Sequence, residues 1–489
     1  MCGILGISNI ENAAHSVYKG LLTLQHRGQD AAGILSFNPR NEKFHLHKDC
    51  GLAATVFDRE IIAGLQGNIA IGHTRYSTVG KGDKEDLQPL ILNHPFGLGM
   101  VHNGNLVNYF EKSRDLQERE FRHPLTSNDL EVLQNILSLS LIKELASTRP
   151  SPPPSSSEVL ITMLGRAVHE VYREVSGAYA VIGILAGKGM FAFRDPHGIR
   201  PLVLGKKNHP DEGGPAYCIA SESTTLNFLN FDFVEDIPPG TLIFIDQNAN
   251  LFKKKILAQV NEKPCMFEWV YFASPESTMA KRSVYTTRHN LGHLLAKQIT
   301  KLREHENFPL DVVAPIPDSS RIAAISLAET LKLPLRELLI KNRYIQRSFI
   351  LNGQENRENA VELKLSPVFS EIRGKNILLV DDSIVRGTTS KRLVAMMRRA
   401  GALRVYLAIT CPPIRFPCML GLDFPSANEL VAYKRSADQV AQEIGADKII
   451  YLGQEDLKAA INLPDLCMAC LDGNYPVDIT ASREFQARR

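Results

Sequence analysis

The stretch GKNILLVDDSIVRGTTSKRL, residues 374–393, decides the fold of the second half of the chain. Its apolar run Ile377–Val380 predicts a buried strand, and Asp381 and Asp382 follow at the carboxyl end of that strand. A short loop then passes Gly387 and leads into a sequence with the pattern of a helix. This order is typical of an α/β protein, in which ligands bind at the carboxyl edge of a parallel sheet.

The loop also has the chemistry of a phosphate-binding site. Backbone N–H groups and hydroxyls at the start of the helix, in Thr388, Thr389 and Ser390, form a cradle for an anion, and the helix dipole favours negative charge there. The two acids before the loop suit a ligand with vicinal hydroxyls at one end and a phosphate at the other. Paired Asp and Thr residues also cap helices without binding a ligand, so an Asp–Asp pair alone does not separate the two interpretations.

The sequence around this stretch favours a parallel sheet. From about Cys265 onward, strand-like runs at 310–318 and 404–410 alternate with helical runs at 319–333 and 388–402. Such alternation indicates parallel strands covered by helices.

The first half of the chain has a different pattern. Short apolar runs end in polar loops or glycine turns at residues 68–78, 96–106, 178–195, 215–223 and 240–255. We expect a mixed domain built on antiparallel sheets here. Three prolines beside three serines, in Arg149–Glu158, predict a solvated insertion within this domain and not a boundary. The expected division of the chain is a first domain at 1–240, a linker at 241–265, a second domain at 266–455 and a C-terminal segment at 456–489.

Composition excludes several classes of protein. The 489 residues carry a net charge of only +3, which gives no support for a nucleic-acid partner. No run of about 18 apolar residues is present to span a membrane, and the start of the chain does not resemble a secretory signal. Eight cysteines in so long a chain are not typical of a secreted disulfide framework. We therefore expect a cytoplasmic protein whose cysteines are thiols, metal ligands or nucleophiles.

Cys2 is the candidate nucleophile. Cysteine is small enough for Met1 to be trimmed, and the freed α-amine, with an ordinary pKa of about 7.7–8.0, then accepts the thiol proton at neutral pH. The thiolate would attack a carboxamide, release ammonia and leave a thioester that water hydrolyses. A lone Cys at position 2 is more commonly a small buried hydrophobe, so the context matters.

The segments around residues 75, 103 and 129 supply what this chemistry needs. Asn103 and Gly104, in HNGN, offer a side-chain amide and a backbone N–H to an oxyanion. Arg75, in GHTRYST, offers a cation for a substrate carboxylate, and Asp129 an acid for a substrate ammonium. Taken singly, each is more commonly a turn residue or a surface charge.

Together, CGI, HRGQD, GHTRYST and HNG resemble the motifs of the class II glutamine amidotransferases, the N-terminal nucleophile hydrolases. The resemblance implies an αββα sandwich and places Arg27, in HRGQD, in the glutamine site beside Arg75 and Asp129. The loop at 381–390 resembles the phosphoribosyl-pyrophosphate signature of type I phosphoribosyltransferases, which implies a parallel-sheet α/β domain. Both together resemble the glutamine phosphoribosylpyrophosphate amidotransferase family, nearly end to end. That family takes ammonia from glutamine to phosphoribosyl pyrophosphate and yields 5-phosphoribosylamine, glutamate and diphosphate, in the first committed step of purine synthesis.

This resemblance implies a role for each residue of the phosphate loop. The acids would hold the ribose hydroxyls, the TTS segment the 5′-phosphate, and Mg²⁺ the diphosphate, with Ser319, Asp381 and Asp382 as the magnesium-side residues. The implied phosphoribosyl pyrophosphate ligands in and before the helix are Asp381, Asp382, Ser383, Arg386, Gly387, Thr388, Thr389 and Ser390.

KNRYIQRSFI, Lys341–Ile350, resembles the start of a loop that closes over the substrate, which implies that Lys341, Arg343 and Arg347 neutralise its charge. A solvated basic surface strand is the alternative. The continuation departs from the family, because Asn352 replaces a usual Pro and Glu358, Asn359 and Glu362 stand where basic residues are usual. This loss of positive charge leaves the strength of substrate binding and the ease of closure open, and it does not affect the acids or the phosphate cradle.

Four cysteines stand where iron–sulfur members of the family place the ligands of a [4Fe–4S] cluster: Cys265, Cys418, Cys467 and Cys470. The resemblance implies a structural cluster, with zinc or free thiols as alternatives. Members with a cluster commonly carry a short propeptide, whereas only Met1 precedes Cys2 in this sequence. Core packing is the default for Cys50, Cys218 and Cys411.

Two other functions remain open on sequence grounds. One is a class II amidotransferase with another acceptor, such as a hexose phosphate, although its phosphate loop would differ. The other is a regulatory protein that senses phosphoribosyl pyrophosphate or purine nucleotides without turnover. Feedback inhibition by purine nucleotides and a homotetramer are family expectations that no motif demonstrates.

Overall fold

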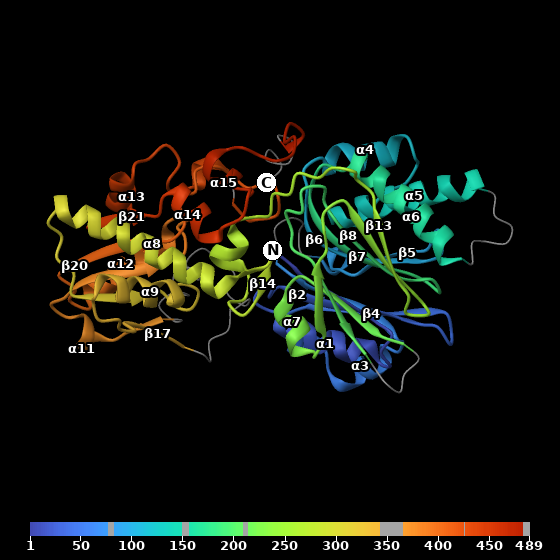
Figure 1. Cartoon of the computed structure of the whole chain (residues 1–489), viewed down its shortest axis with the longest axis horizontal. Helices are drawn as coiled ribbons and strands as arrows, with labels where there is room; N and C mark the ends of the chain where they lie inside the picture. The colour runs from blue at the N-terminus through green and yellow to red at the C-terminus, as the bar shows by residue number, and fades with distance from the viewer. Residues whose placement is uncertain (77–82, 149–155, 209–213, 343–364, 425, 483–489) are drawn as a thin grey trace.

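The computed structural model describes residues 1–76, 83–148, 156–208, 214–342, 365–424 and 426–482. The chain forms two lobes, and its N-terminus lies between them (Figure 1). No helix in these ranges is long and apolar enough to cross a membrane.

The first lobe contains two stacked antiparallel sheets. The first has the order β11-β9-β10-β1-β4-β2-β3 and consists of β1 (Gly3–Ser8), β2 (Ala31–Asn38), β3 (Lys43–Cys50), β4 (Ile69–Arg75), β9 (Val203–Lys207), β10 (Ala216–Ala220) and β11 (Asp232–Asp236). The second has the order β13-β12-β8-β7-β6-β5 and consists of β5 (Leu90–Leu92), β6 (Leu98–Leu106), β7 (Gly177–Leu185), β8 (Gly189–Arg194), β12 (Thr241–Asp246) and β13 (Leu251–Lys255).

Apolar side chains of both sheets interdigitate between the two layers, including Ile4, Ile71, Val101 and Ile182, which are fully buried. Further helices cover the outer face of each sheet: α1 (Ala13–Thr23), α2 (Ala53–Val56), α3 (Arg59–Gly64) and α7 (Ser223–Phe228) on the first, and α4 (Tyr109–Glu118), α5 (Asp129–Thr148) and α6 (Ser157–Glu174) on the second. A single turn, η1 (Lys84–Asp86), precedes β5. The predicted αββα sandwich is confirmed.

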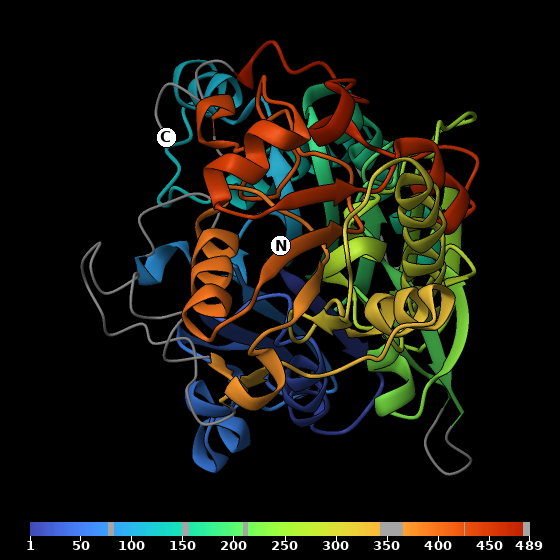
Figure 2. The ribbon, with the colours of Figure 1, turned by 90° about the vertical axis from the view of Figure 1, so that its left-hand side faces the viewer.

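The second lobe is built on a parallel sheet of order β16-β19-β20-β21, with strands β16 (Val312–Pro315), β19 (Asn376–Asp381), β20 (Arg404–Ile409) and β21 (Lys448–Tyr451). Helices α8 (Val284–His305) and α9 (Arg321–Leu331) lie on one side of it, and α12 (Thr388–Arg399) and α13 (Ala437–Ile444) on the other (Figure 2). The predicted parallel-sheet domain is confirmed, and its buried strands are continuous apolar runs, as both faces are covered.

Shorter elements complete this lobe: η2 (Glu268–Phe272), β14 (Thr278–Met279), β15 (Arg282–Ser283), β17 (Leu339–Lys341), β18 (Leu365–Pro367), α11 (Phe369–Ile372), η3 (Ala427–Glu429), α14 (Gln454–Ile461) and α15 (Ala469–Asp472). The hydrophobic core of the lobe extends to Met1, Val107, Ala178 and Ile199 of the first lobe, so apolar packing is continuous between the two.

Two predicted boundaries are wrong. The linker expected at 241–265 begins with β12 and β13, which belong to the second sheet, because β12 pairs with β8 from Leu242↔Phe193 to Asp246↔Gly189. The sandwich therefore ends at Lys255. The boundary expected after residue 455 cuts through α14, whose buried Leu457 and Ile461 belong to the core of the second lobe. The Pro/Ser insertion lies largely outside the described residues.

Candidate active sites

Cys2 lies directly before β1, against the strand that carries HNGN. Its backbone N–H donates to Oδ1 of Asn103 over 3.1 Å. This bond fixes the orientation of the Asn103 amide, whose Nδ2 is buried and has no hydrogen-bond partner among the described residues. A buried donor without a partner is costly, and it is what a developing oxyanion requires. The structure thus brings Cys2 and Asn103 together as predicted.

Gly104 follows on β6 at a place where no other residue fits. Its φ is +158°, and an added Cβ would lie 1.9 Å from the carbonyl oxygen of Ala178 on β7. On the other side of β6, strand β5 pairs only with Leu98–Met100 and so ends before it reaches Gly104. Gly421 of the second lobe packs against this open side: a Cβ added at Gly421 would lie 3.2 Å from the carbonyl carbon of Gly104.

Asp129 begins α5 and faces the same strand. Its Oδ2 accepts the N–H of Leu106 over 3.0 Å, and its Oδ1 lies 3.3 Å from Nε2 of His102. Burial alone would raise the pKa of the Asp129 carboxyl, but His102 and the hydrogen bonds outweigh it and hold the pKa below its ordinary value. Asp129 is therefore ionised, as an ammonium ligand must be, although binding of glutamine stays a prediction.

Arg75 ends β4 and is buried. The carbonyl oxygen of Arg75 accepts the N–H of Asp30. A Cβ added at Gly28 would lie 2.5 Å from the carbonyl carbon of Arg75. The HRGQD loop thus lies directly on the backbone of GHTRYST. Ser77 and Thr78 of that motif lie outside the described residues.

Arg27 is fully buried beside the nucleophile. Its Nε donates to the carbonyl oxygen of Cys2 over 3.2 Å, and its two terminal nitrogens bond to Glu222 and Glu268. Burial lowers the pKa of the guanidinium, but the two carboxylates outweigh it and hold the pKa above its ordinary value. Direct binding of glutamine by Arg27 stays a prediction, since its charge is already balanced by two acids.

Met1 is present in this chain and buried between the lobes at 1% exposure. Burial, followed by the nearby Arg200 and Arg27 charges, lowers the pKa of its amine to about 5. The amine of Cys2 is part of a peptide bond until Met1 is removed, and only then can it accept the thiol proton.

The phosphate loop lines a cavity of about 440 Å³ at the carboxyl edge of the parallel sheet. Its wall includes Ser319 from the loop after β16, the aromatic residues Tyr271 and Phe272, and Tyr76 from the first lobe. Every predicted ligand of the phosphate loop lines this cavity: Asp381, Asp382, Ser383, Arg386, Gly387, Thr388, Thr389 and Ser390. Gly387, with a φ of +78°, turns the loop into α12.

Of the two adjacent acids, Asp382 is buried and Asp381 is half-buried. Burial and the mutual repulsion of the carboxylates raise the pKa of Asp381 well above its ordinary value, and burial likewise raises that of Asp382. The hydroxyls of Ser319 and Ser383 donate to Asp382, the latter over 2.8 Å. Two adjacent carboxylates with an accompanying hydroxyl are oxygen donors that fit Mg²⁺ and ribose hydroxyls.

The basic residues expected to close over the cavity are placed only in part. Lys341 ends β17 and pairs with Asp318, with 2.5 Å between Nζ and Oδ2, and it does not line the cavity. Arg343 and Arg347 lie outside the described residues, as do Asn352, Glu358, Asn359 and Glu362. Their roles stay predictions.

The four cysteines come from three segments and meet at the junction of the lobes. Cys265 and Cys467 form a parallel β-bridge, and the carbonyl of Cys470 accepts the N–H groups of Arg415 and Phe416 near Cys418. Burial raises the pKa of the Cys470 thiol. Neighbouring thiols raise the same pKa further, in the order Cys418, Cys411, Cys265 and Cys467. The bridge and the two hydrogen bonds are backbone contacts, and that the four thiols hold a cluster stays a prediction.

Several residues of these sites were not assigned from the sequence. Glu222 and Glu268 pair with Arg27, but Glu222 stands in a segment predicted only as a strand, and Glu268 was given no role. Tyr76, directly after the predicted Arg75, has its carbonyl oxygen 3.9 Å from Sγ of Cys2 and also lines the phosphate-loop cavity. Adjacency within GHTRYST was the one signal that could have identified it.

A larger surface hollow of about 1360 Å³ lies among α1, α3 and the end of β2. None of the predicted site residues lines it, and its wall is mostly exposed. We therefore assign the chemistry to the smaller cavity and to the Cys2 site.

Comparison with known proteins finds relatives over nearly the whole chain. A family model described as a phosphoribosyl transferase domain matches residues 283–415. The amidophosphoribosyltransferase of Escherichia coli (strain K12) is 44% identical over 468 residues, which cover 95% of this chain and 90% of that protein. The amidophosphoribosyltransferase of Methanocaldococcus jannaschii is 41% identical over 498 residues, which cover 98% of both.

Two solved structures are similar over both lobes. The glutamine phosphoribosylpyrophosphate amidotransferase from B. subtilis, complexed with ADP and GMP, has a TM-score of 0.82 and 35% identity, covering 98% of each chain. A structure described as the allosteric regulatory enzyme of purine biosynthesis has a TM-score of 0.84 and 35% identity, covering 98% of this chain and 97% of the other. With 41–44% identity to these relatives over nearly its whole length, and the same fold, the chain belongs to the amidophosphoribosyltransferase family.

Proposed function

We propose that this protein hydrolyses glutamine at Cys2 and transfers the ammonia to phosphoribosyl pyrophosphate, which yields 5-phosphoribosylamine, glutamate and diphosphate. The observation that carries the proposal is the position of Tyr76. Its carbonyl oxygen lies 3.9 Å from Sγ of Cys2, while the same residue lines the cavity of Asp381 and Asp382. A site that releases ammonia and a site that consumes it therefore share a wall.

The glutamine half-reaction begins once Met1 is removed. The α-amine of Cys2 accepts the thiol proton, and Sγ attacks the carboxamide carbon of glutamine. Nδ2 of Asn103 and the N–H of Gly104 donate to the oxyanion of the tetrahedral intermediate. As that intermediate collapses, the carbon–nitrogen bond breaks, the amine returns its proton to the leaving ammonia, and a thioester remains for water to hydrolyse. Arg75 and Asp129 bind the α-carboxylate and α-ammonium of glutamine.

In the second half-reaction ammonia attacks C1 of the phosphoribosyl group and displaces diphosphate. The carboxylates of Asp381 and Asp382 accept hydrogen bonds from the ribose hydroxyls, and the start of α12 at Thr388–Ser390 binds the 5′-phosphate. Mg²⁺, held on the side of Ser319 and Asp382, would neutralise charge on the leaving diphosphate. Tyr271 and Phe272 of the wall would limit the access of water to the reacting carbon once substrate is bound.

A [4Fe–4S] cluster on the four gathered cysteines is part of the proposal. Their burial disfavours free thiolates, which the positive charge of a metal group would offset. Among the residues that the structure describes, no three His, Cys, Asp or Glu side chains are spaced to hold one metal ion. The family resemblance favours a cluster on these thiols, with structural zinc or free thiols as the alternatives. When bound, the group would join three segments of the chain.

Three further expectations belong to the same proposal. A similar enzyme from B. subtilis has been solved with ADP and GMP, which supports purine nucleotides as feedback inhibitors here. A homotetramer and a cytoplasmic location remain family expectations.

The test measures glutamate release from glutamine by the purified protein with Mg²⁺, with and without phosphoribosyl pyrophosphate. We expect release that rises when the second substrate is present, and Cys2→Ala should abolish glutamine-dependent synthesis while synthesis from high ammonia continues. If no glutamate is released in either condition, the protein is not a glutaminase. If the rate of glutamate release is the same with and without phosphoribosyl pyrophosphate, the two half-reactions are not coupled. Full glutamine-dependent activity in Cys2→Ala would show that the nucleophile is another residue.

A further inference from the structure

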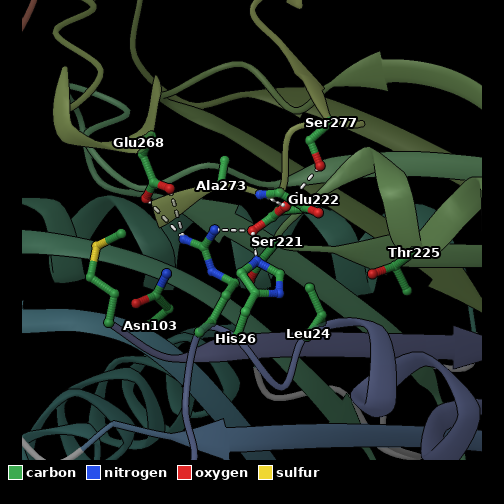
Figure 3. Close-up of polar contacts among 12 residues, drawn as sticks. Leu24, His26, Asn103, Ser221, Glu222, Thr225, Glu268, Ala273 and Ser277 are labelled. Carbon is green, nitrogen blue, oxygen red and sulfur yellow. Dashed lines mark hydrogen bonds and ion pairs between the residues drawn. The ribbon is translucent and has the colours of Figure 1, made fainter. Parts of the chain in front are cut away.

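A buried cluster of charges includes Glu222 and Glu268, which lie on opposite sides of a guanidinium group (Figure 3). The guanidinium of Arg27 is its centre. One terminal nitrogen bonds to Glu222 from the start of α7, and the other bonds to both oxygens of Glu268 over 2.9 and 3.0 Å. All three side chains are at most 2% exposed. One glutamate belongs to the first lobe and the other to η2 of the second, so Arg27 joins the two lobes.

The cluster holds the nucleophile residue by its backbone. Nε of Arg27 donates to the carbonyl oxygen of Cys2 over 3.2 Å, and the N–H of Cys2 is held by Asn103 on the other side. With both backbone groups of Cys2 bonded, the direction of its Cα–Cβ bond is set. The two glutamates fix Arg27 itself, because a planar guanidinium bonded to carboxylates at both ends has one orientation left.

The same carboxylates hold a wall of the phosphoribosyl cavity. Oε2 of Glu222 accepts the N–H of Ser274 over 2.8 Å and the hydroxyl of Ser277 over 2.7 Å. Glu268 begins the segment whose Tyr271 and Phe272 line the cavity. The segment from Glu268 to Ser277 is thus tied at both ends to Arg27 or its partner, and its middle faces the substrate.

Charge makes this arrangement specific. Burial would raise the pKa of Glu222, but Arg27 and His26 outweigh it and hold the pKa well below the ordinary value. His26 contributes a contact of 2.8 Å from Nε2 to Oε1 of Glu222. Buried Arg200 also lies 3.8 Å from Glu268, so two arginines face two glutamates. Loss of one negative charge leaves this buried group with an uncompensated positive charge, which favours movement of the Arg27 guanidinium away from Cys2.

We propose that Glu222 and Glu268 are positioning residues for the glutamine half-reaction: through Arg27 they orient Cys2, and through Ser274 and Ser277 they transmit occupancy of the phosphoribosyl cavity to it. This rests on Cys2 as the nucleophile under the proposed function. The carboxylates touch neither glutamine nor phosphoribosyl pyrophosphate; they act by holding groups that do.

Glu222→Gln and Glu268→Gln test the proposal, because they keep shape and remove charge. A small displacement of a nucleophile lowers the rate of the chemical step far more than substrate binding. We expect the kcat of glutamine-dependent synthesis to fall about 10- to 100-fold, with the KM for glutamine and the ammonia-dependent rate nearly unchanged. The stimulation of glutamate release by phosphoribosyl pyrophosphate should also be lost.

Glu276→Gln is the matched control. Glu276 lies in the same segment but is exposed and does not contact Arg27, so its variant should keep the stimulation. Equal losses of ammonia-dependent and glutamine-dependent rates in Glu222→Gln would mean a merely structural role and overturn the proposal, as would wild-type kinetics. If both charge variants fail to fold, Ser277→Ala decides, since it removes one bond to Glu222 and no charge. Unchanged stimulation in Ser277→Ala would then reject the coupling.

The Cys2→Ala variant separates this inference from the proposed function. If Cys2→Ala has no glutamine-dependent activity and Glu222→Gln has wild-type kinetics, Cys2 is the nucleophile and the positioning role of Glu222 is rejected. If Cys2→Ala keeps its activity, the nucleophile assignment falls first.

Discussion

The backbone N–H of Cys2 and the side chain of Asn103 are joined by a hydrogen bond of 3.1 Å, although 101 positions separate them in the chain. The bond occupies Oδ1 of the amide and leaves Nδ2 buried without a partner among the described residues. One interaction thereby places the nucleophile and aims the oxyanion donor. Burial of the unpaired Nδ2 group is unfavourable in the free enzyme. A hydrogen bond to the oxyanion offsets this unfavourable free energy when the intermediate forms.

Asn103→Ala removes this donor. We expect kcat for glutamine hydrolysis to fall by about 10²–10³-fold, the loss that one oxyanion donor typically causes. The ammonia-dependent synthesis of phosphoribosylamine should stay near the wild-type rate, since that reaction uses the other cavity. Parallel steady-state assays with glutamine and with ammonia measure both. A glutamine-dependent kcat within about threefold of wild type would show that the oxyanion is stabilised elsewhere.

Gly104→Ala tests the strand that carries this site. The new Cβ would lie 1.9 Å from the Ala178 carbonyl oxygen at a φ of +158°, so β6 and β7 must separate. We expect a loss of about 2–4 kcal/mol in the free energy of unfolding, from strain and overpacking together, and loss of glutaminase activity.

Gly187→Ala is the control for that change. Gly187 also has a positive φ, +65°, but nothing lies within 4 Å of its added Cβ. Its variant should lose only about 1 kcal/mol, from the backbone conformation. Thermal unfolding of the two variants gives the comparison, and equal losses would contradict a steric origin.

The sequence was sufficient for residues that stand in contiguous motifs. Cys2, Asn103 and the loop from Asp381 to Ser390 each fall within a few residues whose chemistry is local, and the structure gathers them at two sites. Hydrophobic patterning likewise predicted both kinds of sheet, because period and length distinguish buried parallel strands from antiparallel ones.

What the sequence could not show is pairing between distant segments. Glu222 lies 195 positions from Arg27 and Glu268 lies 241 positions from it, and neither glutamate is marked by periodicity or spacing. The boundary at 240 failed for the same reason. The runs that became β12 and β13 were strand-like, but the choice of sheet depends on pairing with β8, which no local pattern reveals.

Asp381→Asn should stabilise the free enzyme while it weakens substrate binding. Burial and Asp382 raise the pKa of the Asp381 carboxyl, so the folded state binds its proton more tightly than the unfolded state. Such a group costs stability as pH rises from the unfolded pKa, about 3.9, through the raised folded pKa. The neutral amide avoids this cost, so its gain in Tm should be larger at pH 8 than at pH 5.

Thermal unfolding at the two pH values, without substrates, measures the effect, and the KM for phosphoribosyl pyrophosphate measures the functional loss. We expect that KM to rise at least about tenfold, since a charged hydrogen bond to substrate is worth about 1.5–3 kcal/mol. A lower Tm for Asp381→Asn at pH 8 would show that the carboxylate is stabilising, contrary to its half-buried position beside the carboxylate of Asp382.

Iron analysis of anaerobically purified protein tests the cysteine group. Cys470 is 6% exposed and lies among the other three thiols. Cys470→Ser should therefore lose bound iron and the visible absorption of a cluster. It should also unfold at a lower temperature, because the cluster no longer joins the three segments. Cys218→Ser is the matched control, since Cys218 is equally buried but belongs to the core of the first lobe. It should keep the iron content of the wild type. A wild-type protein that contains zinc and no iron would replace the cluster with a structural zinc site, and one without either metal would leave the four thiols as packing residues.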